Sequence, residues 1–576
     1  MDKRWVIAEP ISDDVKKQFP EIAPAVLQLL WTRGLTTQEE IDVFLGPDWS
    51  RDVYSHDLFN NMVAAVNRVF ESLEGGEVIS IHGDYDADGV CGTAVLVSAL
   101  RDICRALNFD EKKITTYIPH REKEGYGMSV STMEHLHEHD KTRLVITVDC
   151  GISNKPAVDR GKELGVDTVI CDHHTMPEEL PDQAILIHPL VPGEAFPNKH
   201  LCGTGVAYKL ACGLIDEARR RGADLPDGYS KWLLDLVAIA TVTDVMPLSG
   251  ENRVLEKYGL LVLNKTRRTG IQKLLDVAGS KIGELDTVSI GFQIGPRLNA
   301  AGRMTHAQEA LELLIEEDEL RATELAMRLQ EINKERQKAS QAMYVQAESQ
   351  LKTMGDDKLL VVWQEGWGAG LVGLVAGKVV SKYGKPTFVV GRDGDKFVGS
   401  GRSPEGFDIT QAMRHASDHL DKFGGHPQAC GFSVHGEEKF LRAVESMRAY
   451  AEEQITLEDL GPRVNIDAQV DLDEVDWPLY DALQPFRPFG TGNPRPLFLS
   501  KGAKVVSFSA VGKDGSHLKL RLQGRGGKIL PAIGFRLGDW VDRLTIGAEV
   551  DVVFEVQVNE WNGNRELQIR VEDLKQ

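Results

Sequence analysis

Histidines and aspartates that can ligate a metal follow short apolar runs at several places in the first half of the chain. The residues of this kind are His82, Asp84, Asp86, Asp88, Asp149, His173, His174 and Asp244. Asp244 is the least expected of them, because it follows the apolar run LVAIATVT, which has little use for a carboxylate. Carboxylate oxygens and imidazole nitrogens together are ligands suited to Mn²⁺ or Mg²⁺. The pattern therefore indicates a centre for divalent cations.

A centre of this composition could hydrolyse a phosphodiester. One aspartate that bridges two ions, roughly 3.5 to 4 Å apart, is an economical arrangement for that reaction, and the ions would activate water near neutral pH. A calcium loop is a competing interpretation, because acidic residues alternate from Asp84 to Gly89. Position 12 of such a loop is Val95 here and not an acidic residue, so the calcium interpretation fails. The other alternative is that each side chain is only a helix cap or a hydrogen-bonding group.

The elements that carry these residues have the pattern of a parallel sheet with crossover helices. From Glu77 onward, short apolar runs alternate with helical patterns, which is typical of that architecture. The predicted strands are Val78 to Ile81, Leu144 to Val148, Thr168 to Ile170 and Ile185 to Ile187. Ligands of open α/β sheets lie beyond the carboxyl ends of the strands. Because the polar residues follow those ends, we expect them to converge on one rim of the sheet.

The second half of the chain predicts further units. Asp318 to Thr353 has neither Gly nor Pro and is rich in helix formers, so a connecting helix of roughly 50 Å is expected. A second α/β region follows, and after Pro462 valine-rich alternating segments predict a small barrel, with an OB-fold as the favoured kind. The predicted parts are an accessory segment at 1–50, a catalytic α/β region at 51–305, connecting helices at 306–354, the second α/β region at 355–460 and the barrel at 461–576.

The composition narrows the class of protein. The 576 residues are 42% hydrophobic and 27% charged, and no apolar run approaches the roughly 18 residues of a membrane span. The amino end lacks the apolar core of a signal peptide, so a cytoplasmic protein without membrane contact is expected. The net charge of -21 argues against general adhesion to nucleic acid, although residues 501–576 carry 12 basic and 10 acidic side chains. Seven cysteines without a CxxC pair signal neither a disulfide framework nor a thiolate zinc site.

The motifs resemble a known family. The segments HGDYDADG, VDCG, CDHH and TVTD are similar, in order and spacing, to the four motifs of the DHH phosphoesterase superfamily. Further segments, GPRLNAAGR, SGRS, FGGHPQACGF and PFGTGNPRP, resemble the RecJ family of single-strand-specific 5′→3′ exonucleases. The resemblance implies a parallel-sheet DHH phosphoesterase domain, a long connecting helix, a DHH-associated domain that binds substrate, and a carboxyl-terminal OB-fold barrel that binds nucleic acid.

The resemblance also implies a role for individual residues. His82, Asp86 and Asp149 would hold one ion, and Asp88, Asp149, His173 and Asp244 the other. His174 would face the scissile phosphate as a catalytic residue together with Asp149. Arg121, Ser400 and Arg402 would bind a 5′-terminal phosphate. Arg297 and His426 are further candidates, because guanidinium and imidazole groups donate hydrogen bonds to phosphate. The role of Asp84 stays open.

The activity so implied is two-metal hydrolysis of single-stranded DNA from its 5′ end, with release of nucleoside 5′-monophosphates, in recombination and repair. The family further implies a monomer that contacts a single-strand-binding protein and a helicase. The barrel aromatics Phe508, Phe535, Trp540, Phe554 and Trp561 could include stacking platforms for bases, although most of them suit a core.

Three rival interpretations are open. A phosphodiesterase for small substrates would share the metal ligands, but it would not need the barrel or the long helix. A non-catalytic scaffold would have no reason to keep every ligand. A dinucleotide site at Gly368, Gly370 and Gly373 rests on a fingerprint that is weak when it stands alone.

Overall fold

The computed structural model describes residues 3–355, 357–456, 460–561 and 563–576. Its first unit contains a sheet of five parallel strands in the order β3-β2-β4-β5-β6. The strands are β2 (Val78–Gly83), β3 (Ile114–Tyr117), β4 (Thr142–Val148), β5 (Asp167–Cys171) and β6 (Ile185–Ile187). The four predicted strands are confirmed. Strand β3 was not predicted, because it is only four residues long and mostly polar.

Helices cover both faces of this sheet, as its largely buried central strands require. On one face, α5 (Met62–Glu74), α6 (Ala87–Leu107) and α9 (Gly203–Arg220) pack against Ile81 and Ile146. On the other face, α7 (Val130–Glu138) and α8 (Lys155–Leu164) pack against Val145 and Ile170. Alternate side chains of β4 therefore pack into two separate hydrophobic cores, one on each face of the sheet.

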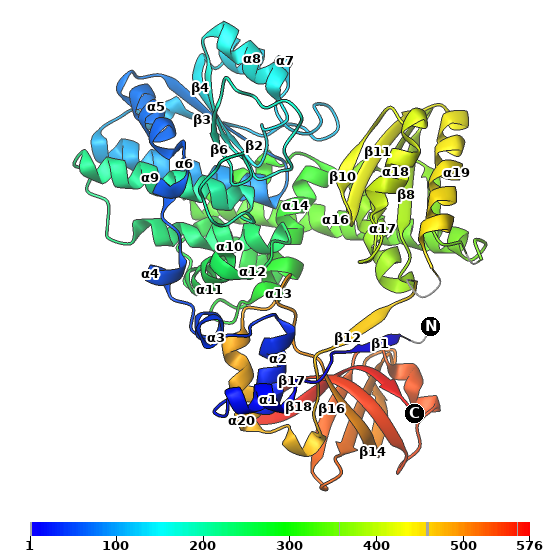
Figure 1. Cartoon of the computed structure of the whole chain (residues 1–576). Helices are drawn as coiled ribbons and strands as arrows, with labels where there is room; N and C mark the ends of the chain where they lie inside the picture. Colours follow the sequence, from blue (N-terminus) through cyan, green and yellow to red (C-terminus); the bar gives the residue numbers. More distant parts are fainter. Residues whose placement is uncertain (1–2, 356, 457–459, 562) are drawn as a thin grey trace.

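A helical layer extends the first core away from the sheet (Figure 1). Its helices are α10 (Leu234–Thr243), α11 (Gly250–Leu263), α12 (Thr269–Ala278), α14 (Gly295–Met304) and α15 (Gln308–Ile315). Helix α10 is buried over nearly its whole length, which explains why its sequence is apolar on every side. No helix of the described residues is long and apolar enough to cross a membrane.

One long helix, α16 (Glu319–Leu351), joins the first unit to the next, as predicted. Its amino-terminal half buries Leu325 and Leu329 in the core of the first unit. Its carboxyl-terminal half buries Met343 and Ala347 against the second unit. The Asp318 side chain caps the helix by accepting a hydrogen bond from the Arg321 N–H.

The second unit is a five-stranded sheet in the order β10-β11-β9-β8-β7, in which only β7 and β8 are parallel. Its strands are β7 (Leu360–Glu365), β8 (Thr387–Asp393), β9 (Lys396–Arg402), β10 (Lys422–His426) and β11 (Ala429–His435). Its helices are α17 (Ala369–Tyr383), α18 (Ile409–His415) and α19 (Glu437–Gln454). This unit confirms the predicted second α/β region.

The carboxyl-terminal unit is a closed barrel, because β14 pairs with both β15 and β17. Its strands are β14 (Phe498–Val511), β15 (His517–Gln523), β16 (Ile529–Gly534), β17 (Glu549–Trp561) and β18 (Asn564–Lys575). A parallel pairing of β16 with β18 closes a five-stranded path, in agreement with the predicted OB-fold.

Residues near the start of the chain pack on this barrel, which the sequence did not predict. Strand β1 (Arg4–Ile7) pairs in parallel with β12 (Arg463–Ile466). Helices α2 (Pro24–Thr32) and α3 (Gln38–Leu45) bury apolar side chains in the same core as the barrel strands. Figure 1 shows these segments, in blue, beside the orange and red barrel.

We expect Leu29→Ala to destabilise the barrel although Leu29 lies in a different part of the sequence. The Leu29 side chain is fully buried in the core that α2 shares with the barrel. Loss of a buried leucine typically costs about 2 to 5 kcal/mol, so calorimetry should show the barrel transition at a lower temperature. Leu320→Ala is the matched control, because the Leu320 side chain is 78% exposed. Equal melting profiles of the two variants would contradict the shared core.

Candidate metal centre and phosphate-binding groups

The predicted ligands converge on the rim formed by the carboxyl ends of β2, β4 and β5. His82 is on β2, Asp149 directly follows β4, and His173 follows β5 by two residues. Asp86 caps the amino terminus of α6 by accepting hydrogen bonds from the N–H groups of Asp88 and Gly89. Asp244 comes from another direction, as the residue at the carboxyl terminus of α10.

Three sets of side chains offer ligand atoms that lie within 4.8 Å of one another. The sets are Asp149 with His173 and His174, Asp88 with His173 and Asp244, and Asp84 with Asp86 and Asp149. The Nε2 atom of His173 lies 3.1 Å from Asp149 Oδ1 and 3.5 Å from Asp244 Oδ2. It also lies 3.7 Å from Asp88 Oδ2. Because Asp149 and His173 each belong to two sets, the sets form one continuous cluster.

The backbone fixes Asp149 in an uncommon conformation. Its φ angle is 61°, a left-handed region that aspartate tolerates better than most residues. The Asp149 N–H donates to the Cys171 carbonyl oxygen at 2.9 Å, so the residue stays attached to β5. Gly203 packs directly on it, because a Cβ at Gly203 would lie 2.7 Å from the Cα of Asp149. The side chain is thus held at the rim from both sides.

Helix α9 holds Asp88. The N–H groups of Gly203 and Thr204 donate to its two carboxylate oxygens at 2.7 and 2.8 Å. The Thr204 hydroxyl donates to the Asp88 carbonyl oxygen at 2.7 Å. These contacts place a buried carboxylate at the amino terminus of an 18-residue helix, whose first N–H groups satisfy both of its oxygens.

The cluster has the properties of a cation site. Three buried atoms within it, His82 Nε2, Asp84 Oδ1 and Asp244 Oδ2, lack a hydrogen-bond partner among the described residues. Burial, followed by the charges of Asp88 and Asp86, raises the pKa of Asp149 well above its usual value. Burial and the charge of Asp88 do the same to the pKa of Asp244. Divalent cations would satisfy the unpaired atoms and compensate the repulsion, so the residues fit such ions.

His174 is oriented by two residues that the sequence analysis did not select. Its Nδ1 atom lies 2.8 Å from Asp172 Oδ1, and the Tyr126 hydroxyl lies 3.0 Å from the same nitrogen. Tyr126 also donates to the Asp149 carbonyl oxygen at 2.9 Å. Burial acts to lower the pKa of His174, but the hydrogen bond and charge of Asp172 outweigh it, so the pKa is raised. The signal for Asp172 was its place between β5 and the two histidines.

The predicted phosphate donors lie on both α/β units. Ser400 and Arg402 are on β9, where Arg402 donates to the Ser400 hydroxyl oxygen at 3.0 Å. Arg121 lies over the Tyr85 ring at 4.8 Å, next to the metal-binding segment. Burial lowers the pKa of Arg402, and the charge of Arg121 contributes to the same effect.

Two other predicted donors have different surroundings. Arg297 donates to the Gln293 carbonyl oxygen and to the Gln330 side chain, so several of its donors serve packing between α14 and α16. His426 ends the exposed strand β10. Sequence reasoning missed Arg303, which ends the GPRLNAAGR segment. Burial and the charge of Arg121 lower its pKa to about 10, and it donates to the Gly370 carbonyl oxygen of α17.

A groove begins beside Asp244 and leads to the barrel. One cavity of about 590 Å³ is lined by Thr243, Arg303 and Arg336. A second cavity of about 1110 Å³ shares Arg336 with it and reaches Arg536 of the barrel unit. Burial lowers the pKa of Arg336, and its Nε atom has no hydrogen-bond partner among the described residues. Among the described residues, Arg336 and Arg536 form no ion pair, whereas Arg495 and Lys382 of the same linings pair with Asp286 and Glu348.

Comparisons with known proteins agree with this geometry. The family described as "DHH family, N-terminal domain" matches residues 78–241, "DHHA1 domain" matches residues 356–453, and "RecJ OB domain" matches residues 466–573. The single-stranded-DNA-specific exonuclease RecJ of Bacillus subtilis is 36% identical over 99% of this chain and 70% of its own. The chain belongs to the RecJ family.

Other RecJ proteins are similar over nearly the whole chain. The RecJ exonuclease of Thermus thermophilus is 32% identical over 96% of this chain and 76% of its own. A crystal structure of RecJ from Thermus thermophilus in complex with Mn²⁺ matches with a TM-score of 0.82, at 29% identity. That match covers 100% of this chain and 79% of the other. The same protein has also been solved with Mg²⁺.

The structure brings the predicted ligands together with two differences in grouping. Asp84, whose role the sequence left open, lies with Asp86 and Asp149 in one set. Among the described residues, His82 belongs to none of the three sets, although its unpaired Nε2 is buried at the same rim. Burial lowers the pKa of His82 to about 4, so this imidazole is neutral and able to ligate a metal. The assignment of each ligand to one ion stays a prediction.

We expect Asp149→Asn to raise the melting temperature in chelator and to weaken Mn²⁺ binding. The change removes one charge from a cluster of repelling carboxylates, and asparagine tolerates the positive φ angle of this position. Scanning calorimetry and isothermal titration with Mn²⁺ would measure both effects. Asp159→Asn on α8 is the control, because its side chain is 43% exposed and outside the cluster. A variant that melts at a lower temperature in chelator would show that the Asp149 charge stabilises the apo fold.

Proposed function

We propose that this protein is a single-stranded-DNA-specific exonuclease that removes nucleoside 5′-monophosphates from the 5′ end by metal-dependent hydrolysis. The observation that carries the proposal is the continuous cluster of Asp149, His173 and their neighbours in a chain similar to RecJ exonucleases over nearly its full length. Recombination and repair of DNA are the processes that the family implies.

The cluster would hold two divalent cations, Mn²⁺ or Mg²⁺. We assign His82, Asp86 and Asp149 to one ion, and Asp88, Asp149, His173 and Asp244 to the other. When bound, such ions lower the pKa of water and compensate charge on a phosphate. Asp84 lies close enough to Asp86 and Asp149 to contribute a further oxygen.

His174 would act on the scissile phosphate directly. Its raised pKa favours the protonated ring, and the carboxylate of Asp172 stabilises that charge. Asp172 itself is held by the N–H groups of Ile152 and His173, so the imidazole has a fixed direction. A protonated, oriented imidazole can donate a hydrogen bond to a phosphate oxygen as charge develops on it.

The 5′ end would be recognised where the two α/β units face one another. Arg121 approaches from the first unit, and Ser400 and Arg402 approach from β9 of the second. Guanidinium groups bind a terminal phosphate, which carries more charge than an internal one, through paired hydrogen bonds. Arg297 and His426 are secondary candidates for phosphate contacts. A strand would thus be held at its end before the bond beyond it is cleaved.

The rest of the strand would follow the groove toward the barrel. Arg303, Arg336 and Arg536 supply cations at successive points of the groove. Phe292, which lines both cavities, is 77% exposed and offers a ring on which a base can stack. A phosphodiesterase for small substrates would not need a groove of this length. A non-catalytic scaffold would not need a complete set of metal ligands.

The aromatic residues of the barrel differ in availability. Phe535 is 52% exposed, whereas Phe554 is fully buried in the core. Phe508 and Trp540 are half-buried against the same core, and the side chain of Trp561 lies outside the described part of the structure. Phe535 is therefore the barrel residue that we favour as a stacking platform.

Further expectations rest on the family resemblance. We propose that the enzyme acts in the cytoplasm as a monomer, and that a single-strand-binding protein and a helicase supply its substrate.

Digestion of end-labelled strands tests the proposal. Single strands labelled at the 5′ end should release the label first, as a mononucleotide, in Mn²⁺ or Mg²⁺. Duplex DNA, RNA and reactions with chelator should give little product. Release from the 3′ label first would contradict the polarity, and preferred cleavage of dinucleotides would favour the small-substrate interpretation.

We expect Arg402→Ala to slow digestion of 5′-phosphorylated strands more than that of 5′-hydroxyl strands. Loss of a charge-assisted contact is worth roughly 1.5 to 3 kcal/mol, or about ten- to a hundredfold in rate. Arg442→Ala on α19 of the same unit is the control, since its side chain is 61% exposed. Equal losses on both substrates would mean that Arg402 serves the fold or a general backbone contact.

A further inference from the structure

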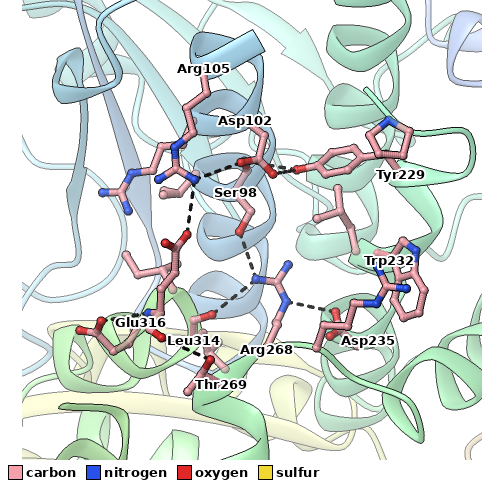
Figure 2. A pocket seen from close by; sticks show the side chains of 17 residues that line it. Ser98, Asp102, Arg105, Tyr229, Trp232, Asp235, Arg268, Thr269, Leu314 and Glu316 are labelled. Atoms are coloured by element: carbon pink, nitrogen blue, oxygen red, sulfur yellow. Dashed lines mark hydrogen bonds and ion pairs between the residues drawn. The ribbon is translucent and has the colours of Figure 1, made fainter. Parts of the chain in front are cut away.

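The first unit contains another cavity, separate from the groove, which Figure 2 shows from close by. Its volume of about 390 Å³ suits a small ligand. The carboxyl-terminal half of α6, the start of α10 and the 3₁₀ helix η3 (Tyr229–Leu233) form its walls, together with the segments before α12 and after α15. No residue of the metal cluster or of the groove lines this cavity.

The acidic groups of the cavity are already occupied. Asp235 accepts hydrogen bonds from Thr266 and Arg268 at 2.9 and 3.3 Å. Asp102 accepts from Tyr229 at 2.6 Å and from Arg105 at 3.3 Å. Figure 2 shows the contacts of Asp102 with Tyr229 and Arg105, and the position of Arg268 between Ser98 and Asp235. Glu317 lies 3.4 Å from Arg105. Glu316 accepts hydrogen bonds from the N–H groups of Glu317 and Asp318, and among the described residues it is the one carboxylate of this lining without a cationic partner.

Two arginines of the cavity have no such compensation. Within the described residues, Arg101 forms no hydrogen bond or ion pair. The Arg267 guanidinium stacks on the Trp232 indole, with its Cζ atom 3.7 Å from the ring centroid. Arg267 also forms no ion pair with any described residue. The cavity thus combines an aromatic and guanidinium stack with free positive charge, beside apolar walls such as Leu233 and Ile315.

We propose that this cavity binds a nucleoside monophosphate. The phosphate would accept hydrogen bonds from Arg101 and Arg267, because unpaired guanidinium groups favour phosphate over neutral ligands. The base would extend the stack that Trp232 and Arg267 begin, since bases stack on both indole and guanidinium planes. The inference does not depend on the proposed exonuclease activity, and the site is separate from the metal cluster.

The position of the cavity connects it to the metal cluster. Helix α10 begins at the cavity and ends at Asp244, a length of roughly 15 Å at 1.5 Å per residue. Helix α6 begins at Ala87, next to Asp88, and lines the cavity from Val97 onward. Arg268 donates to both Ser98 and Asp235, so it ties the two helices together. A ligand that shifts this tie would move two metal-binding segments at once, and binding would alter the rate of hydrolysis.

Calorimetric titration of the full chain with dAMP in chelator tests the binding site. Chelator removes the ions that would hold a mononucleotide at the metal cluster. We expect one binding event, which Arg101→Gln and Arg267→Gln each weaken by about tenfold or more. Arg220→Gln is the control, because Arg220 ends α9 outside the cavity and its side chain is 72% exposed. This variant should bind dAMP with the affinity of the unchanged protein. Absence of binding, or affinities of Arg101→Gln and Arg267→Gln equal to that of the unchanged protein, would overturn the site.

Two comparisons complete the test. Inorganic phosphate and deoxyadenosine should each bind more weakly than dAMP; equal affinity of phosphate would overturn the assignment to a nucleotide. With Mn²⁺ present, the digestion rate is measured with and without dAMP for the unchanged protein and for Arg267→Gln. The factor by which dAMP changes the rate should differ between the two proteins. Equal factors would mean that dAMP acts only as a product at the metal cluster, and would overturn the connection along α6 and α10.

Discussion

Several aspartates with mutually repelling charges are buried at one rim of the parallel sheet. The strand ends and helix ends around this rim are placed so that they hold these carboxylates close together. Burial raises the pKa of Asp84, Asp149 and Asp244, so their ionised forms are costly in the absence of compensating charge. The protein supplies part of the compensation through His173 and through the amino terminus of α9. The remainder must come from cations, and the site is built to require them.

The same crowding explains why rigid elements supply most of these residues. Asp86 caps α6, Asp88 is fixed by the start of α9, and Asp244 ends a helix that is buried on all sides. A carboxylate on a mobile loop would turn away from its neighbours and into solvent. Strand ends and helix ends do not permit that movement, so the ligand set is preorganised for its ions.

Periodicity and strand-end residues were enough to predict the parallel sheet, its rim and the long helix α16. The barrel was equally accessible, because alternating valines mark its strands. Contacts between distant segments were not accessible. Asp172 orients His174 through a hydrogen bond, and its only local signal was its place between β5 and the two histidines. Tyr126 matters through its hydrogen bond to His174, and Arg303 through its burial and its contact with α17, and no local pattern indicates either. The association of α2 and α3 with the barrel was missed because an amphipathic helix does not reveal the surface on which it packs.

The pairing of β1 with β12 has a consequence for how the protein is made. Arg4 leaves the ribosome early, but its partner Arg463 follows roughly 460 residues later. At synthesis rates of about 5 to 20 residues per second, the first segment is without its partner for roughly 20 to 90 s. Its apolar side chains are exposed to the cellular environment during that time, while the parallel-sheet unit can already fold. The pairing of β1 with β12 can therefore form only after residues 463–466 have been synthesised, later than the parallel-sheet unit is complete.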